Sequence, residues 1–311
     1  MGNDNFKIWM AQIRANFLIL AALLVTIGLA LSYKYQPSGT QFNIAYAILL
    51  VIGVVSAHIS VNLFNEYSDY HTKIDFNTKR TPFSGGSGML TGGKTKPSSV
   101  RFAALLTLFI AAAIGIFFAF VAHWSILVVS IVGAFAILFY TKFLAKLVMG
   151  EFFAGLALGT LVVLGTYIAM TATPASSLSV LLPSEVIWVS IPPGILTSLL
   201  LLINEFPDTE ADKKGGRKHL VIKFGQKNAA YIYTLGMVAT FGIIIFLPIS
   251  GISSAWILLA LLPLPLAVQA SSIAIQHGND LDKLVPALGS NVITVLATDL
   301  LLAVSILIAV I

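Results

Sequence analysis

Long apolar runs dominate the chain, and short polar segments separate one run from the next. A helix needs about 20 mostly apolar residues to cross the hydrocarbon layer of a bilayer, and most of these runs approach that length. They lack the alternation of apolar and polar positions that is typical of membrane β-barrel strands. The pattern therefore predicts an all-α membrane protein, a bundle of nine transmembrane helices over approximately residues 16–33, 43–64, 101–122, 124–140, 150–172, 185–204, 229–249, 253–275 and 285–310.

Positively charged residues fall on one side of this predicted topology. Cytoplasmic connections of membrane proteins are enriched in Lys and Arg. With a cytoplasmic N-terminus, only Lys34 of the 18 Lys and Arg residues lies on the outer side. A miscounted helix before the connection at 205–228 would scramble this segregation, so the bias favours both the helix count and the orientation. We expect a multi-pass protein of the cell membrane whose long loops are cytoplasmic and whose first apolar run is retained.

Composition agrees with a protein whose main solvent is lipid. Apolar residues make up 58% of the chain, charged residues 10%, and the mean hydropathy is +0.93, which excludes a water-soluble globule. Cysteine is absent, which excludes disulfides, thiolate metal sites and cysteine catalysis. No soluble module is visible, so we expect one membrane domain over residues 1–311, membrane lipid around it and no nucleic-acid partner.

The two longest polar connections begin with the same pattern, Asn-Glu-aromatic-x-Asp, at residues 65–69 and 204–208. Each copy follows a predicted helix, the second and the sixth. Four helices separate the copies, and an even number of crossings returns the chain to the same side of the membrane. The two motifs are therefore expected to face each other as parallel internal repeats.

Spacing within the motifs predicts which side chains point the same way. Residues four apart share one face of a helix, so the second motif aligns Asn204, Asp208 and Asp212. Asn65 and Asp69 are aligned in the same manner. Asp75 falls off that face unless the helix breaks before it. Pro207 lacks an N–H group and disfavours helical geometry at the preceding residue, which predicts a kink or restart of the sixth helix.

Carboxylates packed so closely repel one another unless a cation holds them. Mg²⁺ prefers oxygen ligands and commonly bridges protein carboxylates to substrate phosphates. Basic residues also follow the two motifs, namely Lys73, Lys79, Arg80, Lys213, Lys214, Arg217 and Lys218. Acids and bases at a helix end can also form a solvated rim, but the repetition of the motif favours a magnesium site that binds a diphosphate.

These motifs resemble those of the UbiA superfamily of intramembrane aromatic prenyltransferases. That superfamily carries an Asn-containing aspartate motif after the second helix and an Asp-x-x-x-Asp motif after the sixth, which match Asn65, Asp69, Asp75, Asp208 and Asp212 here. The resemblance covers nearly the whole chain. It implies a helical bundle whose central cavity opens sideways to the lipid, with Mg²⁺ and a prenyl diphosphate near the cytoplasmic end.

Within the superfamily, the sequence is most similar to the 1,4-dihydroxy-2-naphthoate prenyltransferases of menaquinone synthesis. The similarity rests on residues 149–153, on residues 164–167, and on a first motif that extends to Asp75 before a basic, glycine-rich tract. Many 4-hydroxybenzoate enzymes instead place the last acid of this motif where this chain has Lys73. Other aromatic acceptors and related substrates remain open, since 4-hydroxybenzoate, homogentisate, a chlorin or a glycerol phosphate would use the same diphosphate chemistry.

The resemblance also implies roles for particular residues. The expected catalytic acids are Asp69, Asp208 and Asp212. The expected magnesium ligands are Asn65, Asp69, Asp75, Asp208 and Asp212. The expected diphosphate contacts are Lys79, Arg80, Lys142, Lys146, Arg217 and Arg14. The expected acceptor or prenyl pocket includes His58, Asn62, Tyr67, Tyr140, Asn204 and Phe206. Ordinary packing is the alternative role for the three aromatic residues, and a helix–helix hydrogen bond is the alternative for the first two.

The glycine-rich tract at residues 84–88 and 92–93 has neither a flanking strand nor the ending of a phosphate-binding P-loop. We expect either a mobile lid over the diphosphate or a plain flexible connector. A membrane transporter is the rival class for the whole chain, because repeats and acidic residues also build transport pathways. Transport sites lie near the bilayer midplane, whereas both motifs are predicted at helix ends, which favours the enzyme.

Overall fold

The computed structural model describes residues 2–36, 41–141 and 143–310, and in this part of the chain it contains helices and no strands. The first half comprises α1 (Gly2–Gln12), η1 (Ala15–Phe17), α2 (Leu18–Lys34), α3 (Ile44–His71), α4 (Ile74–Asn77), α5 (Pro97–Val121), α6 (Ser125–Phe139) and η2 (Leu144–Lys146). The second half comprises α7 (Gly150–Gly155), η3 (Leu156–Thr160), α8 (Leu161–Thr171), η4 (Leu178–Val180), α9 (Ser184–Lys214), α10 (Leu220–Ile249), η5 (Ala255–Leu261), α11 (Leu264–His277) and α12 (Leu281–Ile308). The predicted all-α class is confirmed.

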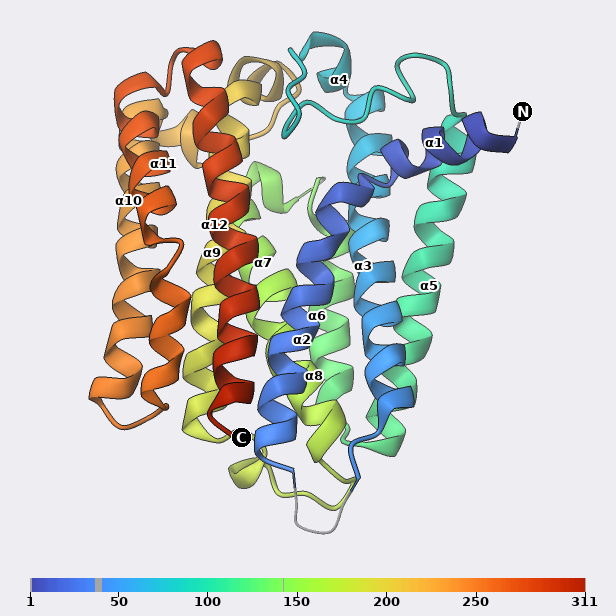
Figure 1. Ribbon diagram of the computed structural model, residues 1–311. Coiled ribbons are helices and arrows are strands. Elements are labelled where there is room, and N and C mark those ends of the chain that lie inside the picture. The colour runs from blue at the N-terminus through green and yellow to red at the C-terminus, as the bar shows by residue number, and fades with distance from the viewer. Residues whose placement is uncertain (1, 37–40, 142, 311) are drawn as a thin grey trace.

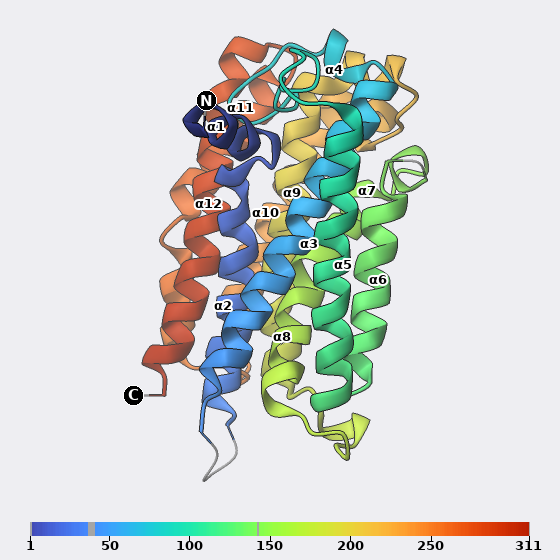
Figure 2. The same ribbon diagram turned by 90° about the vertical axis from the view of Figure 1, so that its right-hand side faces the viewer.

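The long helices run side by side along one axis, while α1 lies across one end of the bundle (Figures 1 and 2). Among the described residues, eight helical segments have the length and hydropathy of a membrane span: Ala15–Lys34, Ile44–His71, Pro97–Val121, Gly150–Thr171, Ser184–Lys214, Leu220–Ile249, Ala255–His277 and Leu281–Ile308. The fourth predicted span corresponds to α6, which is apolar but has only 15 residues. The structure thus shows a multi-pass membrane protein, and nine crossings stay a prediction.

Two of the predicted spans are interrupted helices. The span at 150–172 consists of α7, the five-residue π-helical segment η3, and α8. This span packs closely on α9, since a Cβ atom on Gly159 would lie 2.5 Å from the Cα of Gly194. The span at 253–275 begins as the 3₁₀ helix η5 and continues as α11 after Pro263. The π-helical turn and the close glycine contact place α7 and α8 directly against a motif-bearing helix.

Both motif-bearing helices are longer than predicted. α3 ends at His71 and α9 at Lys214, whereas the predicted spans end at residues 64 and 204. The motifs therefore lie on the last turns of helices. α9 continues through Pro207 as one helix, so the helix does not restart there, and the predicted kink stays a prediction. The interruption occurs instead in α10, where Gly225 has a φ of 79° and a ψ of 157°.

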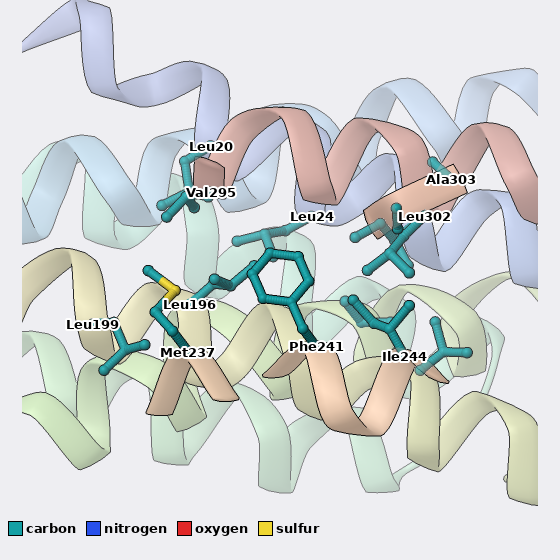
Figure 3. Close-up of a cluster of buried hydrophobic side chains, with 14 of the residues drawn as sticks. Leu20, Leu24, Leu196, Leu199, Met237, Phe241, Ile244, Val295, Leu302 and Ala303 are labelled. Atoms are coloured by element: carbon teal, nitrogen blue, oxygen red, sulfur yellow. The ribbon is translucent and has the colours of Figure 1, made fainter. Parts of the chain in front are cut away.

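A buried apolar cluster joins α2, α9, α10 and α12 (Figure 3). Its members include Leu20, Leu24, Leu196, Leu199, Met237, Phe241, Ile244, Val295, Leu302 and Ala303. Helix association in a bilayer depends on close packing, because lipid tails are as apolar as these side chains. The cluster fixes α9 laterally and so fixes the position of the second motif.

Candidate active site

The two acidic motifs lie at the same end of the bundle, on the last turns of α3 and α9 (Figure 1). After α3 the chain reverses at Lys73, which has a left-handed backbone with a φ of 64°. Such a conformation is uncommon for a residue other than glycine. The short helix α4 follows and buries Asp75. The break required to bring Asp75 toward the motif is therefore present.

Arg217, in the connection between α9 and α10, links the two motifs. Its Nη1 donates a hydrogen bond to Asp212 Oδ1 at 3.0 Å. Its Nη2 donates to Asn65 Oδ1 at 2.8 Å and also to Asp69. Burial opposes the charge of the guanidinium, but the Asp69 and Asp212 carboxylates hold the pKa of Arg217 above its ordinary value. An internal cation thus joins acids that are far apart in the sequence.

Other oxygens of the two motifs have no such partner. Asp208 Oδ1 and Asn204 Oδ1 are buried without a hydrogen-bond partner in the described part of the chain. Burial, reinforced by the negative charges of Asp69 and Glu66, raises the pKa of Asp75 to about 8. Buried polar atoms normally have partners, so these oxygens indicate a place where a cation or a polar ligand binds.

The donor chemistry of this cluster suits Mg²⁺, which prefers carboxylate and amide oxygens. Among the described residues, however, no three acidic or histidine side chains converge closely enough to hold a metal ion as they stand. The guanidinium of Arg217 lies between the two groups of acids. Two of the candidate metal ligands, Asp69 and Asp212, are thus already paired with Arg217.

Two residues of the cluster had no assigned role in the sequence prediction. His219 is buried, with Nδ1 3.4 Å from Glu205 Oε2 and Nε2 3.4 Å from Asp212 Oδ2. Glu151 is also buried, and its Oε1 accepts a hydrogen bond from the N–H of Leu220 at 2.7 Å. Glu151 lies inside a predicted apolar span, where a charged residue is costly. Its position could therefore have marked it as a candidate site residue from the sequence. His219 carried no signal beyond its closeness to the second motif.

The glycine segment, residues 84–88, is tied to α3 by Glu66. One oxygen of the Glu66 carboxylate accepts from the Ser87 N–H at 2.5 Å, and the other accepts from the Ser87 hydroxyl at 2.7 Å. Gly86 lies against Asp75, because a Cβ atom there would be 2.8 Å from Asp75 Oδ1. The segment therefore has a defined place beside the acids.

An apolar cavity of about 340 Å³ reaches the motifs at Asn65 and Asn204 and is lined by residues of α2, α3, α5, α6, α7, η3, α8 and α9. Four of the predicted pocket residues line it: His58, Asn62, Tyr140 and Asn204. Tyr67 instead packs near Arg101, with 6.0 Å between the guanidinium carbon and the ring centroid. Phe206 is buried in the hydrophobic core. Tyr67 and Phe206 therefore do not line this cavity.

The structure places some of the predicted diphosphate contacts at the site and others on the exposed surface. Arg14 lines the cavity, and its Nη2 donates to the Phe83 carbonyl at 3.0 Å. Arg80 and Lys146 are exposed. Lys79 is 72% exposed in its side chain and lies 3.6 Å from Asp282. Arg14 and Arg217 therefore lie at the site, as does Arg80, whose Nη2 donates to the Asp75 carbonyl at 3.5 Å. Lys142 lies outside the described residues.

Comparisons with known proteins identify the family. Residues 21–292 match the UbiA prenyltransferase family. A 1,4-dihydroxy-2-naphthoate octaprenyltransferase of Bacillus subtilis is 28% identical over 256 residues, which are 81% of this chain and 77% of that protein. A UbiA homologue of Aeropyrum pernix K1 has a similar fold, with a TM-score of 0.65 at 19% identity over 89% of this chain and 97% of that chain.

A UbiA homologue of Archaeoglobus fulgidus bound to DMAPP and Mg²⁺ gives a TM-score of 0.56 at 12% identity, over 96% of this chain and 98% of that chain. At such identity the likeness shows the fold alone. The family match, by contrast, spans most of the sequence and includes both acidic motifs. This multi-pass membrane protein is therefore an enzyme of the UbiA prenyltransferase family.

Proposed function

We propose that this protein transfers a polyprenyl group from its diphosphate to an aromatic carbon of 1,4-dihydroxy-2-naphthoate, a step of menaquinone synthesis. The observation that carries the proposal is the position of an acidic and basic cluster at the mouth of an apolar cavity. Such a site suits a substrate with a charged head and an apolar tail. The naphthoate acceptor is supported by the B. subtilis relative, which bears that activity in its name.

Five residues would hold Mg²⁺ in this proposal: Asn65, Asp69, Asp75, Asp208 and Asp212. When bound, the metal supplies positive charge that stabilises the leaving diphosphate. Arg217 would turn from the carboxylates to the diphosphate, and Arg14 would contact it from the other side. Lys79, Arg80 and Lys146 would attract it at the rim, and Lys142 stays a contact predicted from the sequence.

The C–O bond of the prenyl diphosphate breaks with both electrons on the diphosphate, leaving an allylic cation. The aromatic ring supplies the electron pair of the new C–C bond and regains its aromaticity by releasing a proton or carbon dioxide. The apolar cavity excludes water from this cation, and the ring of Tyr140 faces the same space. His58 and Asn62 would provide polar groups for the acceptor in a mostly apolar wall.

We also propose a cell-membrane location with nine crossings, a cytoplasmic N-terminus and a single domain. The support is the charge distribution: both motifs and α1 lie at one end of the bundle, while Lys34 at the other end of α2 pairs with Glu185 at 2.7 Å. Positive charge at one end matches the bias of cytoplasmic loops.

The test is prenyl transfer by the purified protein in nanodiscs, with a prenyl diphosphate and a panel of acceptors. The panel contains 1,4-dihydroxy-2-naphthoate, 4-hydroxybenzoate, homogentisate, a chlorin and glycerol phosphate, each with Mg²⁺ or with EDTA. We expect metal-dependent product with the naphthoate alone, lost in Asp69→Ala and Asp208→Ala and kept in Glu210→Ala, whose side chain is exposed. Product with another acceptor would reassign the substrate, and no product from folded protein would contradict the proposed reaction.

A further inference from the structure

We propose that Glu66 is a positioning residue, which holds the glycine segment over the diphosphate site through its hydrogen bonds to Ser87 and Gln12. The proposal rests on the function proposed for the site. It gives Glu66 a different role from Asp69, which lies three residues later on the same helix and belongs to the same acidic motif. Asp69 pairs with Arg217, whereas Glu66 serves the loop.

The Glu66 carboxylate is 2% exposed and uses both oxygens. Oε1 accepts from the Ser87 N–H at 2.5 Å. Oε2 accepts from the Ser87 hydroxyl at 2.7 Å and from Gln12 Nε2 at 3.0 Å. Hydrogen bonds to a charged acceptor are stronger than neutral ones, so three donors on one buried carboxylate make a firm anchor.

The anchor joins three parts of the chain. Gln12 ends α1, Glu66 belongs to α3, and Ser87 lies in the glycine segment. The same Gln12 accepts through Oε1 from the Thr95 hydroxyl at 2.6 Å, near the start of α5. Glu66 is thus the buried centre of a network that holds the loop between α4 and α5 at its middle, at Ser87, and near the start of α5, at Thr95.

The position of the glycine segment gives this network a functional meaning. Gly86 lies against the Asp75 carboxylate, and the Gly85 backbone lies near Asp208. Residues next to Ser87 therefore lie near acids that belong to different motifs. Gly85 and Gly86 have φ values of 86° and 69°, a conformation that glycine adopts freely. Such a flexible segment needs an external anchor to keep its place.

Hydrogen exchange at residues 84–88, measured by mass spectrometry in nanodiscs without substrate, tests the anchor directly. In Glu66→Gln, one carboxylate oxygen becomes an NH₂ group that cannot accept from Ser87 or Gln12. We expect exchange of the segment to rise by about tenfold or more, as for loss of a hydrogen bond to a charged group. Ser87→Ala should give a smaller rise, and the double variant should be no worse than Glu66→Gln. Glu210→Gln, an exposed control, should match the wild type.

The functional test compares the effects of each substitution on KM and on kcat. Glu66→Gln should raise the KM for prenyl diphosphate by about tenfold, the same factor as the expected rise in hydrogen exchange of residues 84–88. The kcat at saturating substrate should change less. Glu66→Asp, which keeps the charge, should recover part of this loss. Mg²⁺ binding, followed by calorimetry, should persist in Glu66→Gln and weaken strongly in Asp69→Asn.

Unchanged exchange in both Glu66→Gln and Ser87→Ala would overturn the proposal. Loss of Mg²⁺ binding in Glu66→Gln would also overturn it, since Glu66 would then be a metal ligand. If Glu66→Gln does not fold, Ser87→Ala alone carries the exchange test. A wild type that transfers no prenyl group would defeat the proposed function, whereas the exchange result would still decide whether Glu66 anchors the loop.

Discussion

The ends of α3 and α9 carry the same sequence pattern, but the structure gives the two copies different surroundings. In the first copy, Glu66 accepts three hydrogen bonds from the glycine segment and from α1. In the second copy, Glu205 is buried beside His219, and its Oε2 has no hydrogen-bond partner among the described residues. The glutamate of the motif therefore holds a loop in the first copy and is buried beside a histidine in the second.

The aromatic position differs in the same way. Tyr67 is half-buried and lies beside His71 and Arg101. Phe206 is 2% exposed and packs in the core. The Asn and Asp positions differ too: Arg217 joins Asn65 and Asp69 to Asp212 at the end of α9. Asn204 Oδ1 and Asp208 Oδ1 of the second copy have no hydrogen-bond partner among the described residues. The repeat thus places both motifs at the same end of the bundle, while equivalent side chains have different partners in the two copies.

The largest expected effect tests whether the two copies contribute equally to the reaction. Asp69→Asn and Asp208→Asn should each lower kcat by about 10²–10³-fold, the usual cost of losing one electrostatic contact to a leaving group. Each substitution keeps the side-chain shape and removes one charge. Steady-state prenyl transfer at saturating Mg²⁺ measures the loss, with Asp282→Asn at an exposed position as the control. A large loss of kcat in only one of the two variants would show that the two Asp positions contribute unequally to the reaction.

Periodicity and spacing predicted much of this arrangement from the sequence. Apolar runs located the helices, since hydrophobicity over about 20 residues is a strong signal. The repeated motif predicted that Asn65 and Asp69 would meet the second helix. Helix ends were less predictable, because polar residues of α3 and α9 continue the helix into the site instead of starting a loop.

The remaining features depend on contacts between distant segments. The hydrogen bonds of Glu66 to Ser87 and Gln12 span 21 and 54 residues, and no spacing rule relates those positions. Arg217 was predicted as a diphosphate contact from its charge, its place after the second motif and the family resemblance. Its role as a bridge between the motifs emerged only when the folded connection placed it between the carboxylates.

The next effect concerns the bridge itself. Arg217→Ala should destabilise the metal-free protein by about 3–5 kcal/mol, because it leaves buried carboxylates without a partner. Mg²⁺ should recover part of this loss by supplying the missing charge. Thermal unfolding in nanodiscs with EDTA and with Mg²⁺ measures both quantities. A Tm that falls equally in the two conditions would show that Arg217 stabilises the fold independently of the metal site.

The aromatic positions should show a smaller effect, unequal between the copies. Phe206→Ala leaves a cavity in the core and should cost about 2 kcal/mol, below the range for soluble proteins because the unfolded reference state in lipid is also apolar. Tyr67→Ala removes a half-buried ring and should cost about half as much. Equal shifts in Tm for the two variants would contradict the difference in burial between the copies.

The smallest expected effect lies at the one motif position where the copies differ in backbone chemistry, Ser68 and Pro207. Pro207→Ser makes the second copy more like the first and adds an N–H group that can bond to the Ile203 carbonyl. Because α9 is already helical on both sides of Pro207, stability should change by less than about 1 kcal/mol, and kcat should stay within about twofold. Thermal unfolding and steady-state transfer measure the two quantities. A large fall in kcat at unchanged Tm would mean that α9 hinges at Pro207 during the reaction, and the two copies would then differ in motion as well as in contacts.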